Sequence, residues 1–506
     1  MADTSYKNIF KTTFLFGFVQ VARLLVSVVK NKVIAILLGP QGIGILSIFN
    51  SSTELIKTGA GLGISQSAVK DVAEANASND RYSFSKTITV TNRAVIYTSL
   101  LGLIITVLFS PLLSRWGFSD LNHTWSFVLL SIAVFFEIFA NNQMAILKGM
   151  RMLRVLAKVS LFGSIVAVVL GLPTIYLWGE KGIVSSIILS SLSMALYSAY
   201  YVRKIDYERI HLKIKEFIKS ASSMLKMGIS LMMSNFVAFF SNLLIIGYIQ
   251  KVGGLSDVGF FNAGTVLVVS YFSMVTTALN TDYYPRISAK CSDNCALSGE
   301  LFRQSLVGLL LVQPLVIVFV ILAPIAIRIL YTPEFITVLD YTDIAIVGTL
   351  ISVVSNCLGY ILIAKQEARL YLIISVLFAV LIVPLYIVFY HFWGLKGLGI
   401  AYTINVLAQL IVYAFYCWRK YGIVLKREIW TDLLFIIILI IISVYLRRSG
   451  TFLIQVVGVL ILFAMTALFL FYNIKYKMGV DLRTLMKRFS KKDRNYENSN
   501  DHSHEE

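Results

Sequence analysis

The residues best placed to do chemistry are cations set within long apolar runs. Arg23 and Lys30 belong to an apolar run at 14–38, which is long enough to cross a bilayer. Steps of four and three residues place Arg23, Ser27 and Lys30 on one face of an α-helix. A cation near the bilayer midplane costs roughly 2.5–3.5 kcal/mol on insertion scales, so such side chains usually face a protein interior or a watery cavity. The pattern therefore predicts a cavity in which Arg23 and Lys30 bind an anion.

Three more cations, Lys32, Lys57 and Arg93, lie inside apolar runs, together with two carboxylates, Glu54 and Glu137. Glu54 and Lys57 are three residues apart, so they either pair within their helix or contact a substrate or ion. Lys32 lies near one end of its run, where a long side chain reaches the membrane interface. Arg93, also close to the end of a run, is either a similar anchor or a substrate ligand. Glu137 either neutralises a cation or carries a coupling proton.

The composition sets the class of protein. Of 506 residues, 57% are hydrophobic and 14% are charged, whereas a soluble chain would carry about a quarter charged residues. No Walker-type glycine-rich loop and no His-Glu-x-x-His motif occurs. The four cysteines lack disulfide or zinc spacing: Cys291, Cys295, Cys357 and Cys417. We therefore expect an all-α polytopic membrane protein, not an enzyme, with no catalytic residues, metal site or cofactor.

Fourteen apolar runs have the length of about twenty residues that spans a bilayer. They are 13–38, 42–69, 87–112, 124–147, 156–178, 182–202, 226–250, 257–284, 302–330, 340–364, 369–392, 396–418, 430–446 and 451–474. Basic residues gather in the even-to-odd connections, as in Lys148, Arg151, Arg154 and Lys158. By the positive-inside rule, this asymmetry predicts that both termini are cytoplasmic. The net charge of +18 is then explained by topology and contact with anionic membrane lipids, not by nucleic-acid binding.

An internal repeat is visible at an offset of 215 residues. Gln-Gly-Ile-Gly-Ile-Leu at 41–46 matches Ser-Asp-Val-Gly-Phe-Phe at 256–261, Trp-Gly-Glu-Lys-Gly at 178–182 matches Trp-Gly-Leu-Lys-Gly at 393–397, and Asn141 matches Asn356. Three matches at a single offset indicate two homologous six-helix units in parallel orientation, a plan known among transporters. We expect the two units to surround a central cavity.

The repeat predicts the domain boundaries. They are an N-lobe of helices 1–6 at 1–204, a cytoplasmic amphipathic linker at 205–225, a C-lobe of helices 7–12 at 226–420, helices 13–14 at 421–476 outside the repeat, and a basic cytoplasmic tail at 477–506. Ile210, Ile214, Phe217 and Ile218 form an apolar stripe, which predicts a helix at 205–219 lying on the inner membrane face. Similar spacing at 482–489 predicts a second surface helix in the tail.

The two lobes differ in charge. The positions equivalent to Arg23 and Lys30 are Ala238 and Ile245, and the C-lobe carries neutral amides instead. A cationic lobe that faces a milder polar one suits an anionic, hydroxyl-rich substrate. The predicted substrate ligands are Arg23, Lys30, Lys57, Arg93, Asn235 and Asn242, with Glu54 and Glu137 serving coupling or charge balance.

Several short motifs carry a family resemblance. Leu-Leu-Gly-Pro-Gln-Gly-Ile-Gly at 37–44, Thr-Gly-Ala-Gly-Leu-Gly-Ile at 58–64, the charged stretch from Lys70, Leu-Lys-Gly at 147–149 and the Trp-Gly-x-Lys-Gly turns resemble polysaccharide flippases of the Wzx type. These belong to the multidrug/oligosaccharidyl-lipid/polysaccharide exporter (MOP) superfamily. The resemblance implies alternating access and movement of undecaprenyl-pyrophosphate-linked oligosaccharide repeat units, such as O-antigen, from the cytoplasmic to the periplasmic leaflet of the bacterial inner membrane.

The resemblance also sets the expected partners and the alternatives. The partners are the lipid-linked oligosaccharide, membrane lipids and the polysaccharide polymerase machinery, and the energy source is a proton or sodium gradient. One alternative is a lipid II flippase of peptidoglycan synthesis. Another is a membrane glycosyltransferase or polymerase that acts on the same lipid, although mostly short outer connections weigh against it.

Overall fold

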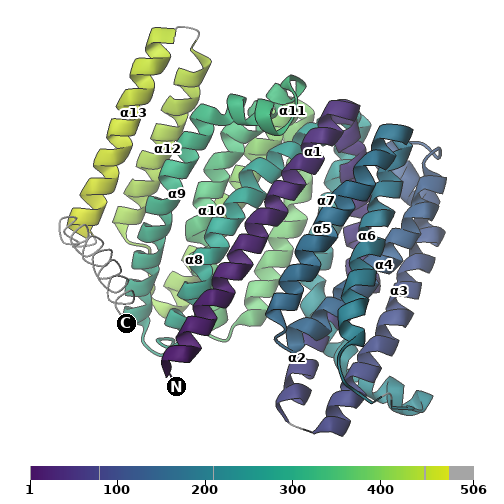
Figure 1. The fold of residues 1–506 in the computed structure, drawn as a ribbon. Helices are drawn as coiled ribbons and strands as arrows, with labels where there is room; N and C mark the ends of the chain where they lie inside the picture. Colours follow the sequence, from purple (N-terminus) through teal and green to yellow (C-terminus); the bar gives the residue numbers. More distant parts are fainter. Residues whose placement is uncertain (1, 79, 209, 450–451, 478–506) are drawn as a thin grey trace, which may run out of the picture. The chain divides into compact units, whose positions relative to one another are not determined.

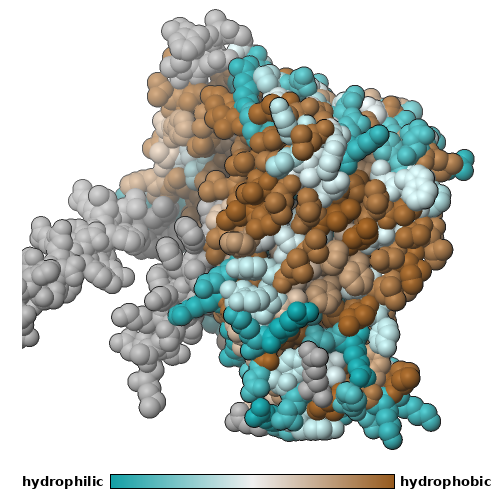
Figure 2. All heavy atoms as spheres, turned by 45° about the vertical axis from the view of Figure 1, so that its right-hand side comes forward, coloured by the Kyte–Doolittle hydropathy of each residue, from teal (hydrophilic) through white to brown (hydrophobic). Residues whose placement is uncertain are grey.

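The protein is built from helices and short connections. The computed structural model describes residues 2–78, 80–208, 210–449 and 452–477, and no strand occurs among them (Figure 1). Eleven helical segments in this part of the chain are long and apolar enough to cross a membrane. On the face shown in Figure 2, hydrophobic residues cover the middle and hydrophilic residues gather towards the ends. The chain is therefore a multi-pass membrane protein, and the predicted all-α fold class is confirmed.

The α-helices are α1 (Ala2–Ala60), α2 (Ile64–Ala77), α3 (Arg81–Phe118), α4 (Thr124–Gly149), α5 (Leu153–Trp178), α6 (Lys181–Arg203), α7 (Ile214–Thr265), α8 (Tyr271–Ser288), α9 (Asn294–Leu330), α10 (Leu339–Ala364), α11 (Ala368–Tyr421), α12 (Arg427–Arg448) and α13 (Phe452–Tyr472). Short π-helical turns follow α7 and α13, at Val266–Ser270 and Asn473–Lys477, and a 3₁₀ turn at Pro333–Val338 precedes α10.

Three long helices each contain a kink at a glycine. Gly39 divides α1, Gly254 divides α7 and Gly394 divides α11, each with a positive φ that breaks the helical backbone. Glycine reaches this region without the steric cost that a Cβ imposes. Each kink falls in a connection that the sequence predicts between two spans. We call residues 2–38 and 40–60 the first and second arms of α1. The count of fourteen spans stays a prediction.

The unusual backbone positions repeat at the predicted offset of 215. Gly39 and Gly254 have φ/ψ of 63°/−159° and 82°/−178°. Gly179 and Gly394 have 58°/−132° and 56°/−137°. The ends of α4 and α10 also match, because Arg151 and Gln366, which follow them, have φ of 56° and 62°. These pairs support the two-unit repeat, although the predicted lobe boundaries themselves stay a prediction.

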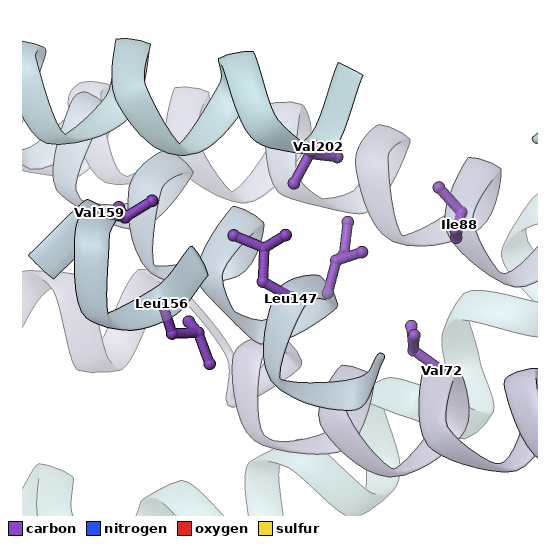
Figure 3. Packing of buried hydrophobic residues seen from close by; sticks show 7 residues of the cluster. Val72, Ile88, Leu147, Leu156, Val159 and Val202 are labelled. Atoms are coloured by element: carbon purple, nitrogen blue, oxygen red, sulfur yellow. The ribbon is translucent and has the colours of Figure 1, made fainter. Parts of the chain in front are cut away.

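By Cα proximity the chain divides into two compact units. Unit 1 comprises Met1–Leu267, Pro324–Ile344 and Arg369–Asn405, and unit 2 comprises Val268–Ala323, Ala345–Ala368 and Val406–Glu506. In unit 1, a cluster of buried aliphatic side chains connects the five helices α2, α3, α4, α5 and α6 (Figure 3). Its members are Val72, Ile88, Ile146, Leu147, Leu156, Val159 and Val202. In unit 2, Ile317, Leu439 and Leu462 join α9, α12 and α13.

The linker differs from its prediction. Residues 206–208 and 210–213 are not helical, and α7 begins only at Ile214, so the predicted surface helix at 205–219 is wrong over its first half. The reason is tertiary packing: Leu212 is buried, and it packs with Ile210 and Phe217 against side chains of α2, α3 and α4. Ile210 and Phe217 of the apolar stripe therefore contact protein, whereas Ile214 and Ile218 are 77% and 58% exposed. The predicted tail helix at 482–489 lies outside the described residues.

The second arm of α1 crosses α7 through a reciprocal close contact. A methyl group added at Gly44 would meet the Leu255 carbonyl oxygen at 2.1 Å, and one added at Gly259 would meet the Pro40 carbonyl oxygen at 2.1 Å. The two glycines are repeat equivalents, and so are Pro40 and Leu255. Small residues let helix backbones approach closely in membranes, where packing replaces the hydrophobic effect as the main driving force between helices.

This crossing predicts that Gly44→Ala destabilises the protein although alanine is the better helix former. Overpacking costs about 1–3 kcal/mol, which outweighs a propensity gain of about 1 kcal/mol. Gly299→Ala in α9 is the matched control, since nothing lies within 4 Å of the added methyl group. The midpoint of thermal unfolding of the purified protein should fall for Gly44→Ala and stay level or rise for Gly299→Ala. Equal shifts for the two variants would contradict the close crossing.

Candidate functional site

A charged cluster lies between the second arm of α1 and α4 in unit 1. Lys57 Nζ is 2.5 Å from Glu54 Oε1 on its own helix and 3.4 Å from Glu137 Oε2 on α4. The Lys57 side chain is 19% exposed and that of Glu137 is 28% exposed, so water screens the pair only partly. The structure therefore brings together three of the predicted residues. The pairing of Glu54 with Lys57 within their helix is observed, and Glu137 adds a second partner from another element.

Two further elements converge on Glu137. Ser191 of α6 donates a hydrogen bond from its hydroxyl to Glu137 Oε1 at 3.3 Å. Lys30, which is half-buried on the first arm of α1, interacts electrostatically with the same carboxylate. Charges in a poorly solvated site are stable only when they are paired and hydrogen-bonded. Lys30, Lys57, Glu54 and Glu137 together carry no net formal charge.

A small polar cavity adjoins Lys57. Its volume is about 80 Å³, well below the roughly 300–1,000 Å³ of typical ligand pockets and sufficient for a few water molecules. The other polar residues of its wall are Thr58, Ser65, Gln66, Asn141, Asn142 and Asn235. Asn142 is buried, and its Oδ1 has no hydrogen-bond partner within the described chain. The cavity thus presents amides and hydroxyls beside a lysine, which is the chemistry that binds hydroxyl-rich anions.

The remaining predicted ligands lie elsewhere. Arg23 is exposed on the first arm of α1, and it forms no ion pair or hydrogen bond with residues that the structure describes. Asn242 of α7 donates to Ser51 Oγ at 3.2 Å. Arg93 of α3 donates from Nη1 to the Leu212 carbonyl oxygen at 2.9 Å and lines a different cavity. Only Asn235 of the two C-lobe amides shares the cavity of Lys57.

Lys32 is engaged by protein groups. Its ammonium donates to the carbonyl oxygen of Arg328 at 2.7 Å and to that of Tyr331. These carbonyls lie at the C-terminal end of α9, where helix carbonyls lack intrahelical partners and carry partial negative charge. The contact joins the first arm of α1 to the end of α9 within unit 1, so Lys32 has a defined structural partner besides any contact with the membrane interface.

Sequence reasoning missed several residues of this site. Ser191, Ser65, Gln66 and Asn142 are single polar residues on separate helices. A lone serine or amide inside an apolar run carries no signal beyond its polarity. Asn141 was noted only as a repeat match, and it donates to Ser65 Oγ at 3.5 Å. Their convergence depends on how α1, α2, α4 and α6 pack, which the sequence pattern does not specify.

Fold and site together define a helical membrane protein with the parallel repeat of a transporter. Residues 33–340 match the family described as polysaccharide biosynthesis protein, and this match covers more than half of the chain. The chain belongs to that family. No curated protein sequence gives a significant match.

Solved structures show the same fold. The chain is similar to a lipid II flippase, MurJ, in an inward closed conformation (TM-score 0.68, 14% identity, 92% of this chain and 99% of that chain). It is also similar to a multidrug resistance MATE family transporter of the MOP superfamily in an inward-facing conformation (TM-score 0.64, 17% identity, 79% and 94%). A third is a MOP superfamily transporter from Pyrococcus furiosus (TM-score 0.56, 16% identity, 81% and 94%). The chain therefore shares the fold of these transporters, as the resemblance to the superfamily predicts.

The charged cluster predicts a specific pattern of stabilities. Lys57→Gln leaves two carboxylates near each other without their shared cation, so it should cost about 1–3 kcal/mol of unfolding free energy. Lys57→Gln combined with Glu137→Gln should cost less than the sum of the single variants. The matched control is Lys70→Gln, because Lys70 pairs with Glu74 on an exposed helix face and contributes at most about 0.5 kcal/mol.

The measurement is denaturant or thermal unfolding of the purified variants in detergent. Strict additivity of the Lys57 and Glu137 substitutions would show that the two side chains are not coupled. A loss for Lys70→Gln as large as that for Lys57→Gln would remove the distinction between the enclosed cluster and an exposed pair.

Proposed function

We propose that the protein is a flippase that moves undecaprenyl-pyrophosphate-linked oligosaccharide repeat units, of O-antigen or a similar polysaccharide, from the cytoplasmic to the periplasmic leaflet of the bacterial inner membrane. The observation that carries the proposal is the Lys57 cluster beside an amide-lined cavity, in a chain of the polysaccharide biosynthesis family with the MOP fold. An anionic diphosphate and a hydroxyl-rich sugar need these two kinds of group.

The cations would act in order along the first helix. Arg23 and Lys30 share a face and are seven residues, or about 10 Å, apart. With the N-terminus in the cytoplasm, the exposed Arg23 meets the pyrophosphate first, and Lys30 and Lys57 hold it deeper in the membrane. Asn235 and the amides of α4 then hydrogen-bond the sugar hydroxyls, since each amide offers both donors and an acceptor.

Alternating access follows from the size of the cavity. A volume of about 80 Å³ admits no sugar unit, so substrate entry requires the helices around it to separate. Three contacts of unit 1 must then break or shift: Asn242 with Ser51, Asn262 with Ser47 at 2.9 Å, and Lys32 with the end of α9. Asn242 released from Ser51 becomes a further ligand for the sugar.

Coupling to a proton or sodium gradient follows from charge balance. In the charged cluster, Lys57 is paired with Glu54 and Glu137. A proton on Glu137, or a sodium ion held by Glu137 and Ser191, removes one negative charge and so changes how strongly the carboxylates hold Lys57. Because the substrate moves outward while the gradient drives the cation inward, the cation and the pyrophosphate occupy the cluster in alternate conformations, as an antiporter requires.

A lipid II flippase is the alternative within transport, because the chain shares the fold of one. A glycosyltransferase or polymerase is the alternative outside transport. The two transporters differ in sugar and not in the pyrophosphate, so Lys30 and Lys57 would serve either substrate. Strains that lack the polysaccharide flippase and strains that lack the lipid II flippase distinguish the two transporters, because the protein should rescue only the strain whose substrate it moves.

Complementation tests the substrate assignment. In a strain without its polysaccharide flippase, Lys30→Ala and Lys57→Gln should reduce surface polysaccharide at least about tenfold at equal expression, since a charge-assisted hydrogen bond contributes about 1.5–3 kcal/mol. Arg23→Ala should give a smaller loss, and Lys70→Ala, an exposed lysine outside the cluster, should match wild type. Full activity of both Lys30→Ala and Lys57→Gln would refute the cationic site. Rescue only of a strain deficient in lipid II transport would assign the alternative substrate.

Proteoliposomes that contain a fluorescent lipid-linked oligosaccharide test the coupling. Wild-type transport should accelerate when a proton gradient, or a sodium gradient, is imposed. Glu137→Gln, which keeps the shape of the side chain and removes its titration, should transport slowly and without response to either gradient. Glu74→Gln, on an exposed face of α2, should respond as wild type does. An unchanged gradient response of Glu137→Gln would exclude this carboxylate as the coupling group.

A further inference from the structure

A second polar cavity of unit 1 lies apart from the Lys57 cluster. It has a volume of about 440 Å³ and is enclosed by α3, α4, α6 and the non-helical connection before α7. Its polar wall consists of Asn92, Arg93, Gln143, Arg203, Tyr207 and His211. Arg203 is the last residue of α6 and Arg93 lies about three turns into α3, so the cavity extends inward from helix ends on the side proposed to be cytoplasmic.

The two arginines of this cavity have no acidic partner. Arg93 donates to the Leu212 carbonyl oxygen, and neither Arg93 nor Arg203 lies within 4 Å of a carboxylate in the described part of the chain. The nearby acids of the connection are used elsewhere: Asp206 and Glu208 pair with Arg81 at 3.1 and 3.8 Å. A guanidinium is always charged and presents a planar fork of donors that matches phosphate oxygens. The cavity therefore favours an anion.

The wall is organised by a hydrogen-bonded chain of side chains. Gln143 Nε2 donates to Asn92 Oδ1 at 3.1 Å, and Asn92 Nδ2 donates to the Tyr207 hydroxyl at 3.2 Å. Gln143 is only 5% exposed, and its Oε1 has no partner among the described residues. A buried acceptor left without a donor costs about 1–3 kcal/mol. A ligand with an anionic group would pair with the two arginines, and a hydroxyl or ammonium donor on the same ligand would pair with Gln143 Oε1.

One side of the cavity is apolar and adjoins the membrane. Ile96, Phe139 and Ala199 line it, and Ile96 is 53% exposed on the outer face of α3. An acyl chain fits beside these side chains, whereas a free phosphate would leave this part of the cavity unfilled. The cavity thus calls for a ligand with an anionic group, a hydroxyl donor and an apolar chain. An anionic phospholipid with a polyol headgroup combines all three. Basic pockets between membrane helices on the cytoplasmic side bind such headgroups.

We propose that this cavity is a binding site for an anionic phospholipid of the phosphatidylglycerol type. Arg93 and Arg203 hold the phosphate, and the headgroup hydroxyls reach Gln143. The bound lipid fastens the 206–213 connection to α3 and α6. Because this connection leads directly into α7, lipid occupancy stabilises the start of that helix. The site is distinct from the Lys57 cavity and does not depend on which substrate is transported.

Lipid titration of the purified full chain in a zwitterionic detergent tests the site. Phosphatidylglycerol should raise the midpoint of thermal unfolding of wild type more than phosphatidylcholine does. In Arg93→Gln with Arg203→Gln, the apparent affinity for phosphatidylglycerol should fall about tenfold or more, at about 1 kcal/mol for each cation. Arg154→Gln with Lys158→Gln, two exposed basic residues at the start of α5, is the matched control and should bind as wild type does.

Two further variants separate binding from folding. Ala199→Phe fills the apolar side and keeps both arginines, and it should also weaken the response to phosphatidylglycerol. Arg93→Lys keeps the positive charge, so it should keep part of the response to phosphatidylglycerol that Arg93→Gln loses. An equal phosphatidylglycerol response in wild type and in both the double arginine variant and Ala199→Phe would overturn the proposal. A response to inorganic phosphate or glycerol 1-phosphate equal to that for the lipid would overturn the choice of ligand. Loss of the response in Lys57→Gln would place the lipid in the other cavity and refute this site.

Discussion

The structure depends on one constraint, that charges inside a membrane domain must be compensated where they lie. Lys57 is the focus of this compensation, because it contacts Glu54 within its helix and Glu137 on α4. Removing water from these groups is costly, and only the mutual attraction of the partners offsets that cost. The same constraint connects both arms of α1 with α4 and α6. Ser191 of α6 donates a hydrogen bond to Glu137, and Lys30 of the first arm interacts electrostatically with it. A site that is this closely balanced responds to the gain or loss of a single charge.

The scaffold around the cluster is symmetric, whereas the chemistry is not. Kinks at Gly39 and Gly254 and the reciprocal approach of Gly44 and Gly259 repeat at an offset of 215, so both repeats use the same backbone solution to bring two helices together. The cations of the Lys57 cluster belong to the first repeat: the position equivalent to Lys30 is Ile245, which is buried. The backbone crossing is thus shared by the two repeats, whereas the charged cluster is not.

The sequence predicted what local pattern determines. The helical class and the connections between spans follow from periodicity and turn residues, and the three-residue spacing gives the pairing of Glu54 with Lys57 as one of two alternatives. The pairing of Glu137 with Lys57 could not be predicted from the sequence, because only tertiary packing brings α4 to the second arm of α1. The same holds for Arg93, whose neighbour Leu212 is more than a hundred residues away. Ile214 and Ile218 of the stripe at 210–218 are exposed, as a membrane-surface helix requires, whereas Ile210 and Phe217 pack against protein. Apolar spacing does not distinguish lipid from the surface of α2, α3 and α4.

Helix α4 links the two polar cavities of unit 1. Asn142 lines the cavity of Lys57 and Gln143 lines that of Arg93, and both are buried with an oxygen that lacks a partner. Neighbouring residues on a helix point about 100° apart, so one turn of α4 presents an unsatisfied acceptor to each side. Glu137 lies less than two turns away on the same helix. A rotation or shift of α4 that satisfies the acceptor in one cavity must move the acceptor in the other, because both are fixed to one rigid backbone. The two cavities therefore share one wall element, α4, which also carries Glu137.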